Sequence, residues 1–139
     1  MAAELLIKPA IALGLIIGIY EAILLHRDVT IPTHRFGHSI HAIFYAIIAV
    51  FATMNVEFVM GYLTFLPEFL QNVLMFRILI GIITMVKIHG VSAAIKGSYG
   101  GGVVGTRETW FHSFLIAALV VLAPYVWPFL EPIAPAWLK

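Results

Sequence analysis

The sequence predicts an all-α integral membrane protein, a bundle of four transmembrane helices with short loops and with both termini on the same side. Of its 139 residues, 62% are hydrophobic and only 11% are charged, and the mean hydropathy is +1.02. A soluble domain carries about 25% charged residues, so most of this chain is expected to contact lipid. The apolar residues follow a helical period, and no alternating pattern is long enough for a barrel. We expect a single transmembrane domain over residues 1–139.

The first two helices are expected at residues 5–26 and 33–66. The first apolar run is long enough to cross roughly 30 Å of hydrocarbon. Glu21 within that run argues against a cleaved signal peptide. Pro32 suits the first turn of the second helix, where its missing N–H has no intrahelical partner to lose. The second segment is longer than a span requires, which predicts a tilted helix or an end that lies in the membrane interface.

The third and fourth helices are expected at residues 69–95 and 107–130. A very short connection at Pro67 predicts that the second and third helices form a tight antiparallel hairpin. Five glycines in residues 97–105 predict a loop, because each destabilises a helix by about 1 kcal/mol relative to alanine. Thr106 is the expected N-cap of the fourth helix. The proline-rich tail after this helix is expected to be extended.

All six histidines fall in one half of the membrane when four spans alternate in direction. They flank the two loops opposite the termini: His26, His34, His38, His41, His89 and His112. The three that begin the second helix are spaced i, i+4 and i+7, so their side chains project within roughly 60° of one another. Tyr45 continues this stripe. Imidazole is costly in lipid unless it is paired or ligated, so we expect a histidine-lined pocket near this face.

A transition metal (copper, iron or zinc) or a b-type haem is the cofactor that such a pocket predicts, because imidazole is the commonest protein metal ligand. The expected ligands are His34, His38 and His41 on the second helix, with His89 and His112 opposite. The expected alternative ligands, or groups that orient the ligands, are Glu21, His26 and Asp28. Histidines near an interface also bond to headgroups, carbonyls or partner subunits, and this alternative stays open for each of them.

The charged residues suggest a binding site, an ion pair and the orientation of the chain in the membrane. Glu21 is a candidate for proton or ion binding, since a carboxylate in a span is by default a functional hypothesis. Arg77 lies in the half opposite the histidines, where we expect a structural ion pair with Glu57 or Glu68. Five of the eight lysines and arginines lie on the histidine side, which predicts that the histidine-rich loops are cytoplasmic and the termini outside.

Composition excludes several function classes and leaves three. The chain has no cysteine, which excludes disulfides, cysteine-based zinc sites, iron–sulfur clusters and c-type haem attachment. A net charge of +1 gives no argument for a nucleic-acid partner. The first expectation is a small subunit of a larger membrane redox complex, with lipid and other subunits or further copies as partners. The alternatives are a homo-oligomeric proton or ion channel or transporter that uses histidine and glutamate, and a structural accessory subunit without a cofactor. Whether the chain is itself an enzyme stays open.

Two short stretches resemble parts of redox families. Arg27-Asp28 followed by Pro32 and His34 loosely resembles a stretch in the C subunits of copper membrane monooxygenases, over less than a tenth of the chain. His89-Gly90 with Lys96-Gly97 before the last helix resembles the haem-bearing anchor subunits of succinate dehydrogenases, which usually have three spans and a fuller motif. Either resemblance implies a redox membrane complex, and neither transfers a site residue to this chain.

Overall fold

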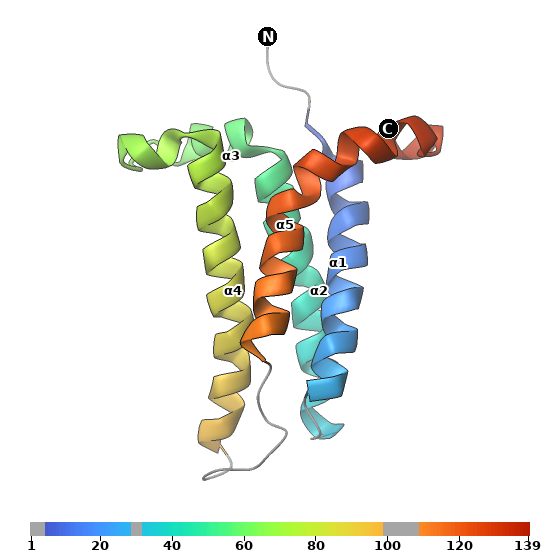
Figure 1. Cartoon of the computed structure of the whole chain (residues 1–139), viewed down its shortest axis with the longest axis vertical. Coiled ribbons are helices and arrows are strands. Elements are labelled where there is room, and N and C mark those ends of the chain that lie inside the picture. The colour runs from blue at the N-terminus through green and yellow to red at the C-terminus, as the bar shows by residue number, and fades with distance from the viewer. Residues whose placement is uncertain (1–4, 29–31, 99–108) are drawn as a thin grey trace.

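Four long helices pack side by side in the described part of the computed structural model, which comprises residues 5–28, 32–98 and 109–139 (Figure 1). Side chains are described for residues 5–27, 39–89 and 109–139. The long helices are α1 (Ile7–Asp28), α2 (Pro32–Met54), α4 (Val73–Ser98) and α5 (Trp110–Leu130). The short elements are α3 (Val56–Tyr62), η1 (Glu68–Gln71), η2 (Glu131–Ile133) and η3 (Ala136–Leu138). These residues include no strand, which confirms the all-helical prediction.

Two of the long helices are long and apolar enough to cross a membrane. These candidate spans are Ile7–Arg27 and Trp110–Ile133. A third candidate exists if α2 and α3 count as one broken span, because together they pass the same test of length and composition. The 22 residues of α1 make a helix about 33 Å long, close to the roughly 30 Å of hydrocarbon in a bilayer.

The helix expected over residues 33–66 is wrong in its second half, because α2 ends at Met54 and α3 leaves it at 94°. The break is at Asn55, a buried residue. Its Nδ2 donates to the carbonyl of Phe51 at 3.0 Å, and its Oδ1 accepts the N–H of Leu6 at 2.8 Å. Asparagine side chains compete with helices by such bonds to the backbone. The excess length of this segment is therefore taken up by a bend.

The tight hairpin expected at Pro67 is not formed, because residues 55–72 make a longer connection that contains α3 and η1. This connection lies at one end of the bundle, on the side of α4, and projects outward from it (Figure 1). Asn72 ends it, since its Oδ1 accepts the N–H groups of Leu74 at 2.9 Å and Met75 at 3.2 Å. A side-chain oxygen that satisfies first-turn N–H groups caps a helix, so α4 begins at Val73 and not at the expected residue 69.

The fourth long helix begins later than expected. Thr109 precedes it, and the Thr109 Oγ1 accepts the N–H of His112 at 3.4 Å. The expected cap Thr106, and most of the expected glycine-rich loop, belong to residues 99–108, which lie outside the described residues. The α4 helix includes the first two residues of that loop, because it continues to Ser98.

The C-terminal tail is not extended, contrary to expectation. The α5 helix continues through Pro124 and Pro128, and the 3₁₀ turns η2 and η3 follow it. Proline fixes φ near −65°, which a 3₁₀ turn accommodates, and a proline stands in the first turn of η2. The Nζ of Lys8 donates to the main-chain oxygen of Lys139 at 3.0 Å, so the chain ends beside the start of α1.

Small residues allow a close contact between α1 and α2. Gly14 and Gly18 lie one turn apart on α1, and both are buried against α2. A Cβ on Gly14 would lie 2.5 Å from the Cα of Ile47, and a Cβ on Gly18 would lie 2.6 Å from the Cα of Ile43. Real Cβ atoms do not approach other atoms so closely, so only glycine fits at these two positions. This G-x-x-x-G pair sets the distance between α1 and α2.

Candidate functional site

The best-defined polar site is built around Glu21, a carboxylate that is only 4% exposed although it lies on a helix of lipid length. Glu21 follows Gly18 by three residues and so continues the face of α1 that packs on α2. It lies seven residues before the end of α1, or about 10 Å along the helix axis. Burial of an acidic side chain at this depth is uncommon, because Glu is almost never fully buried unless it is paired.

Two hydroxyl groups from other helices accompany Glu21. The Tyr45 hydroxyl on α2 forms a hydrogen bond with the side chain of Thr84 on α4, and Tyr45 lies within electrostatic range of Glu21. The Thr84 Oγ1 donates to the carbonyl of Ile80 at 2.8 Å. Three helices therefore contribute to this group, called the Glu21 site: Glu21, Tyr45 and Thr84.

The Glu21 site is connected toward the end of the bundle where α1 ends and α2 begins. His41 lies one turn before Tyr45 on α2, and the two rings stack with centroids 6.4 Å apart and planes 18° apart. The His41 side chain is exposed, and so is that of His26 in the last turn of α1. Titratable and polar groups thus run from the surface at this end to the buried carboxylate.

From the Glu21 site toward the end of the bundle where α2 ends, the buried side chains are apolar. Between Tyr45 and Thr53, the buried side chains of α2 are those of Ala46, Ala49 and Val50. Val120 of α5 belongs to the same apolar core and is fully buried. About two helical turns of apolar side chains therefore separate the Glu21 site from the polar residues at the other end. Among the residues whose side chains are described, polar groups therefore lie on the histidine side of Glu21, and buried apolar side chains lie on the other side.

The predicted metal ligands lie in one half of the bundle, but the described ones do not converge. His34, His38 and Asp28 are on described helical backbone, while their side chains lie outside the described residues. Across residues 5–27, 39–89 and 109–139, no group of three His, Cys, Asp or Glu side chains is placed to hold a metal ion. Metal or haem binding by His34, His38, His41, His89 and His112 stays a prediction.

Two more of the predicted ligands, besides His41, have aromatic neighbours. The ring of His89 on α4 stacks on Trp110 of α5, with centroids 3.6 Å apart and planes 16° apart. The ring of His112 lies 6.0 Å from that of Phe111. The first of these contacts joins α4 and α5 near the end of the bundle where the histidines lie. Flat stacking of this kind is a packing role that needs no bound metal.

The predicted partners of Arg77 are replaced by others. Its Nε donates to the carbonyl of Thr53 at 3.0 Å, and its guanidinium lies 4.9 Å from the centre of the Tyr125 ring. Glu57 and Arg77 line the same pocket, which has a volume of about 230 Å³ and lies at the bend between α2 and α3. Within the described part of the chain, Arg77 forms no ion pair with Glu57 or Glu68. Arg77 instead joins α4 to α2 and α5.

Several residues that build this site were not anticipated. The pair Gly14 and Gly18 was detectable, because G-x-x-x-G in an apolar segment is a known signal of close helix packing. Thr84 carried no signal, since single hydroxyl residues are ordinary in membrane helices. Asn55 lies in an apolar run whose period continues on either side of it. Its effect depends on Leu6, a partner 49 residues away.

The fold and the Glu21 site define the class of this protein. Its described residues form helices and short connections, with two or three helices apolar enough to cross a membrane and a buried carboxylate on one of them. No protein-family model matches the chain, and no curated protein sequence or solved structure is significantly similar to it. The geometry of the Glu21 site is therefore the basis for assigning a function.

Proposed function

We propose that this chain is an integral membrane protein with four spans, α1, α2, α4 and α5, and with both ends on the same side of the membrane. The lengths of these helices support this placement, since each has at least 21 residues. About 20 residues are needed to cross a bilayer. The hydrogen bond between Lys8 and Lys139 supports the common side of the two ends.

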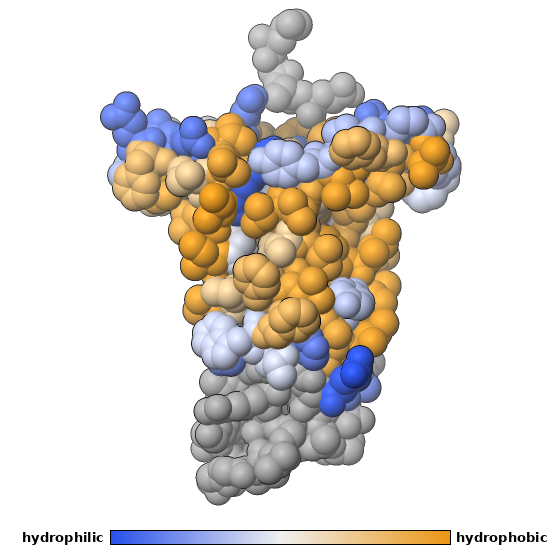
Figure 2. Space-filling model, viewed as in Figure 1, coloured by the Kyte–Doolittle hydropathy of each residue, from blue (hydrophilic) through white to orange (hydrophobic). Residues whose placement is uncertain are grey.

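The segments across one end of the bundle support the same placement. They are residues 55–72 and 131–139, here called the collar. Figure 2 shows hydrophilic side chains along the outer edge of the collar and hydrophobic ones beneath it, on the flanks of the bundle. Exposed aromatic residues belong to it: Phe58, Tyr62, Phe65, Phe69 and Trp137. Such amphipathic segments rich in aromatic residues lie in the membrane interface.

We further propose that the chain binds a proton at Glu21 and works in proton-coupled transport across the membrane, as a transporter or as a transporter's subunit. The observation that carries this proposal is the burial of Glu21 on α1, a helix long and apolar enough to cross a membrane. A carboxylate charge is costly to bury between membrane helices, and uptake of a proton lowers that cost. Intramembrane carboxylates for this reason mark proton and ion pathways.

The one-sided surroundings of Glu21 define how the proton is delivered. His41 and Tyr45 supply groups that exchange protons between the histidine end and Glu21. The apolar layer of Ala49, Val50 and Val120 blocks transfer to the collar end in this conformation. The chain therefore loads a proton from one side, and release to the other side requires a conformational change or a partner subunit.

Labelling with dicyclohexylcarbodiimide tests this proposal, because the reagent reacts with protonated carboxyl groups in apolar surroundings. We expect peptide mass spectrometry to find the modification at Glu21 in the detergent-purified chain, with less modification as the pH rises. Glu21→Gln removes the modified carboxyl, and Glu57→Gln on the exposed surface of α3 serves as the matched control. Absence of modification at Glu21 at every pH, with Glu57 and Glu68 labelled, would contradict the proposal.

Reconstitution in liposomes tests the one-sided access. We expect the wild-type chain alone to give no steady proton flux under a pH gradient, because the apolar layer interrupts the path. Val50→Asp introduces a carboxylate into that layer and should produce a flux that Glu21→Gln abolishes. Steady flux through the wild-type chain would show that the path is continuous and that the apolar layer is not a barrier.

The prediction of a redox subunit is the second candidate, because the backbone places His34 and His38 in the same half of the bundle as His89 and His112. The measurement is an absorption spectrum with elemental analysis on gently purified protein and on its His38→Ala variant. A Soret band, or near-stoichiometric copper, iron or zinc that the variant loses, would establish the cofactor. Protein without band or metal would contradict this candidate and leave the proposal for Glu21 unaffected.

A further inference from the structure

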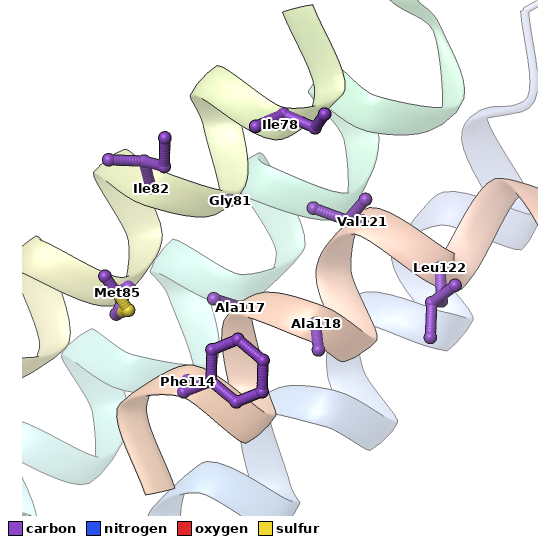
Figure 3. Close-up of a pocket in the computed structure, with 9 residues that line it drawn as sticks. All are labelled: Ile78, Gly81, Ile82, Met85, Phe114, Ala117, Ala118, Val121 and Leu122. Atoms are coloured by element: carbon purple, nitrogen blue, oxygen red, sulfur yellow. The ribbon is translucent and has the colours of Figure 1, made fainter. Parts of the chain in front are cut away.

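An apolar groove runs between α4 and α5, with a volume of about 390 Å³ (Figure 3). Small residues line part of it, among them Gly81 of α4 and Ala117 of α5. Larger side chains flank it, including Ile82, Met85 and Phe114 (Figure 3). All of the residues that line this groove are apolar. The groove therefore accepts a hydrocarbon ligand and offers no hydrogen bond to a polar one.

A cation stands at the collar end of this groove. Arg77 lies one turn before Gly81 on α4, and Tyr125 lies one turn after Val121, another lining residue, on α5. The guanidinium is stacked over the Tyr125 ring, so these two side chains join the helices just beyond the groove. Arg77 is four residues into α4, which places it about 6 Å below the start of this helix at the collar.

The guanidinium retains donors for an anion. Only its Nε–H bonds to the protein among the described residues, through the carbonyl of Thr53. The N–H groups of the two Nη atoms have no acceptor there, and Arg77 is partly exposed. Glu57 shares a pocket with Arg77 without forming an ion pair in the described part of the chain, so the positive charge is not neutralised by contact. Arginine binds phosphate through two parallel N–H groups, the geometry that its Nη atoms provide.

We propose that the α4–α5 groove and Arg77 together bind an anionic phospholipid, with an acyl chain in the groove and the phosphate on the guanidinium. Charge complementarity selects this occupant, because one phospholipid supplies both a hydrocarbon chain for the groove and a phosphate for Arg77. The depth of Arg77 below the collar matches the level where headgroup and acyl chain meet. The inference rests on the proposed membrane placement and is independent of proton binding at Glu21.

Native mass spectrometry of the full chain tests this proposal. The protein is released from detergent micelles that contain dioleoyl phosphatidylglycerol or, separately, dioleoyl phosphatidylcholine. We expect the wild-type chain to retain phosphatidylglycerol preferentially. Arg77→Gln should weaken that retention about ten-fold, the scale of one charge-assisted hydrogen bond. Lys8→Gln, which removes a cation at the same end and outside the groove, is the control that should retain the lipid.

A second variant leaves Arg77 intact. Ala118→Leu adds bulk to a lining residue and should reduce retention of either lipid, while Ala136→Leu in the exposed η3 should not. This variant decides the proposal if Arg77→Gln does not fold. Equal retention of both lipids by the wild-type chain, or unchanged retention in Ala118→Leu, would overturn it. A wild-type dimer that Ala118→Leu converts to a monomer would also overturn it, because a second copy would then occupy the groove.

Discussion

The side-chain oxygen of Asn55 accepts the main-chain N–H of Leu6 at 2.8 Å and thereby joins the end of α2 to the start of α1. The same side chain donates to the carbonyl of Phe51, so both of its polar atoms are used at the bend. Asn55 is nearly fully buried, which removes water as a substitute partner. This one residue couples the 94° bend to the packing of the first two helices.

Replacement of Asn55 by alanine should destabilise the fold. The N–H of Leu6 loses its acceptor, and a buried donor left without a partner costs about 1–3 kcal/mol. Thermal unfolding in detergent, followed by circular dichroism, measures the difference. Asn55→Asp keeps the acceptor for Leu6 but sets a buried carboxylate against the carbonyl of Phe51, so its stability should stay below that of the wild-type chain and fall as the pH rises. Thr64→Ala, on an exposed residue of the same connection, is the control. Equal stability of Asn55→Ala and this control would show that the bond is unimportant.

Hydropathy could predict the helices, because the apolar pattern that indicates a helix lies within the helix itself. The all-helical class follows from an apolar content that covers most of the chain. The bend at Asn55 could not be predicted, because the apolar pattern continues to Leu66 and the hydrogen bond that fixes the bend comes from Leu6. The first residues of α4 and α5 were also predicted a few positions too early. Several polar residues near the start of each helix could have been its cap, and the caps are in fact Asn72 and Thr109.

The candidate site was predictable in one part only. Glu21 was identifiable because a carboxylate within an apolar segment is unusual. Tyr45 was identifiable as the continuation of a helical stripe that includes His41. Their association with Thr84 requires the packing of α4 against α2, which no spacing within a single helix reveals. The same reason explains Arg77, whose partners Thr53 and Tyr125 come from two other helices.

Substitution of Gly14 or Gly18 by leucine should separate α1 from α2. A Cβ at either position would lie within 2.6 Å of a main-chain atom of α2, and a backbone cannot move aside as a flexible side chain can. We expect a fall in the thermal unfolding midpoint for each variant and reduced dicyclohexylcarbodiimide modification of Glu21, because Glu21 lies on the same helix face. Overpacking of this kind typically costs 1–3 kcal/mol.

Gly61 supplies the matched control for this experiment. It lies in the short helix α3, and nothing is within 4 Å of a Cβ built on it. Gly61→Ala should therefore be neutral or should stabilise the protein by about 0.4–1 kcal/mol through the unfolded state. If Gly14→Leu were as stable as Gly61→Ala, the close contact between α1 and α2 would not exist in the membrane protein.

Removal of the Tyr45 hydroxyl should slow protonation of Glu21 and leave the carboxylate in place. Tyr45→Phe retains the ring that stacks on His41 and loses the hydrogen bond to Thr84, so we expect a stability loss of only about 0.5–1.5 kcal/mol. A stopped-flow pH jump with a pH-sensitive dye measures the rate of proton uptake. Uptake should be several-fold slower in Tyr45→Phe with an unchanged final amount, because the terminal acceptor Glu21 is intact. Tyr62→Phe, on an exposed residue of α3, is the control and should behave as the wild-type chain. An unchanged rate in Tyr45→Phe would limit Tyr45 to a structural role and would require another route from the histidine end to Glu21.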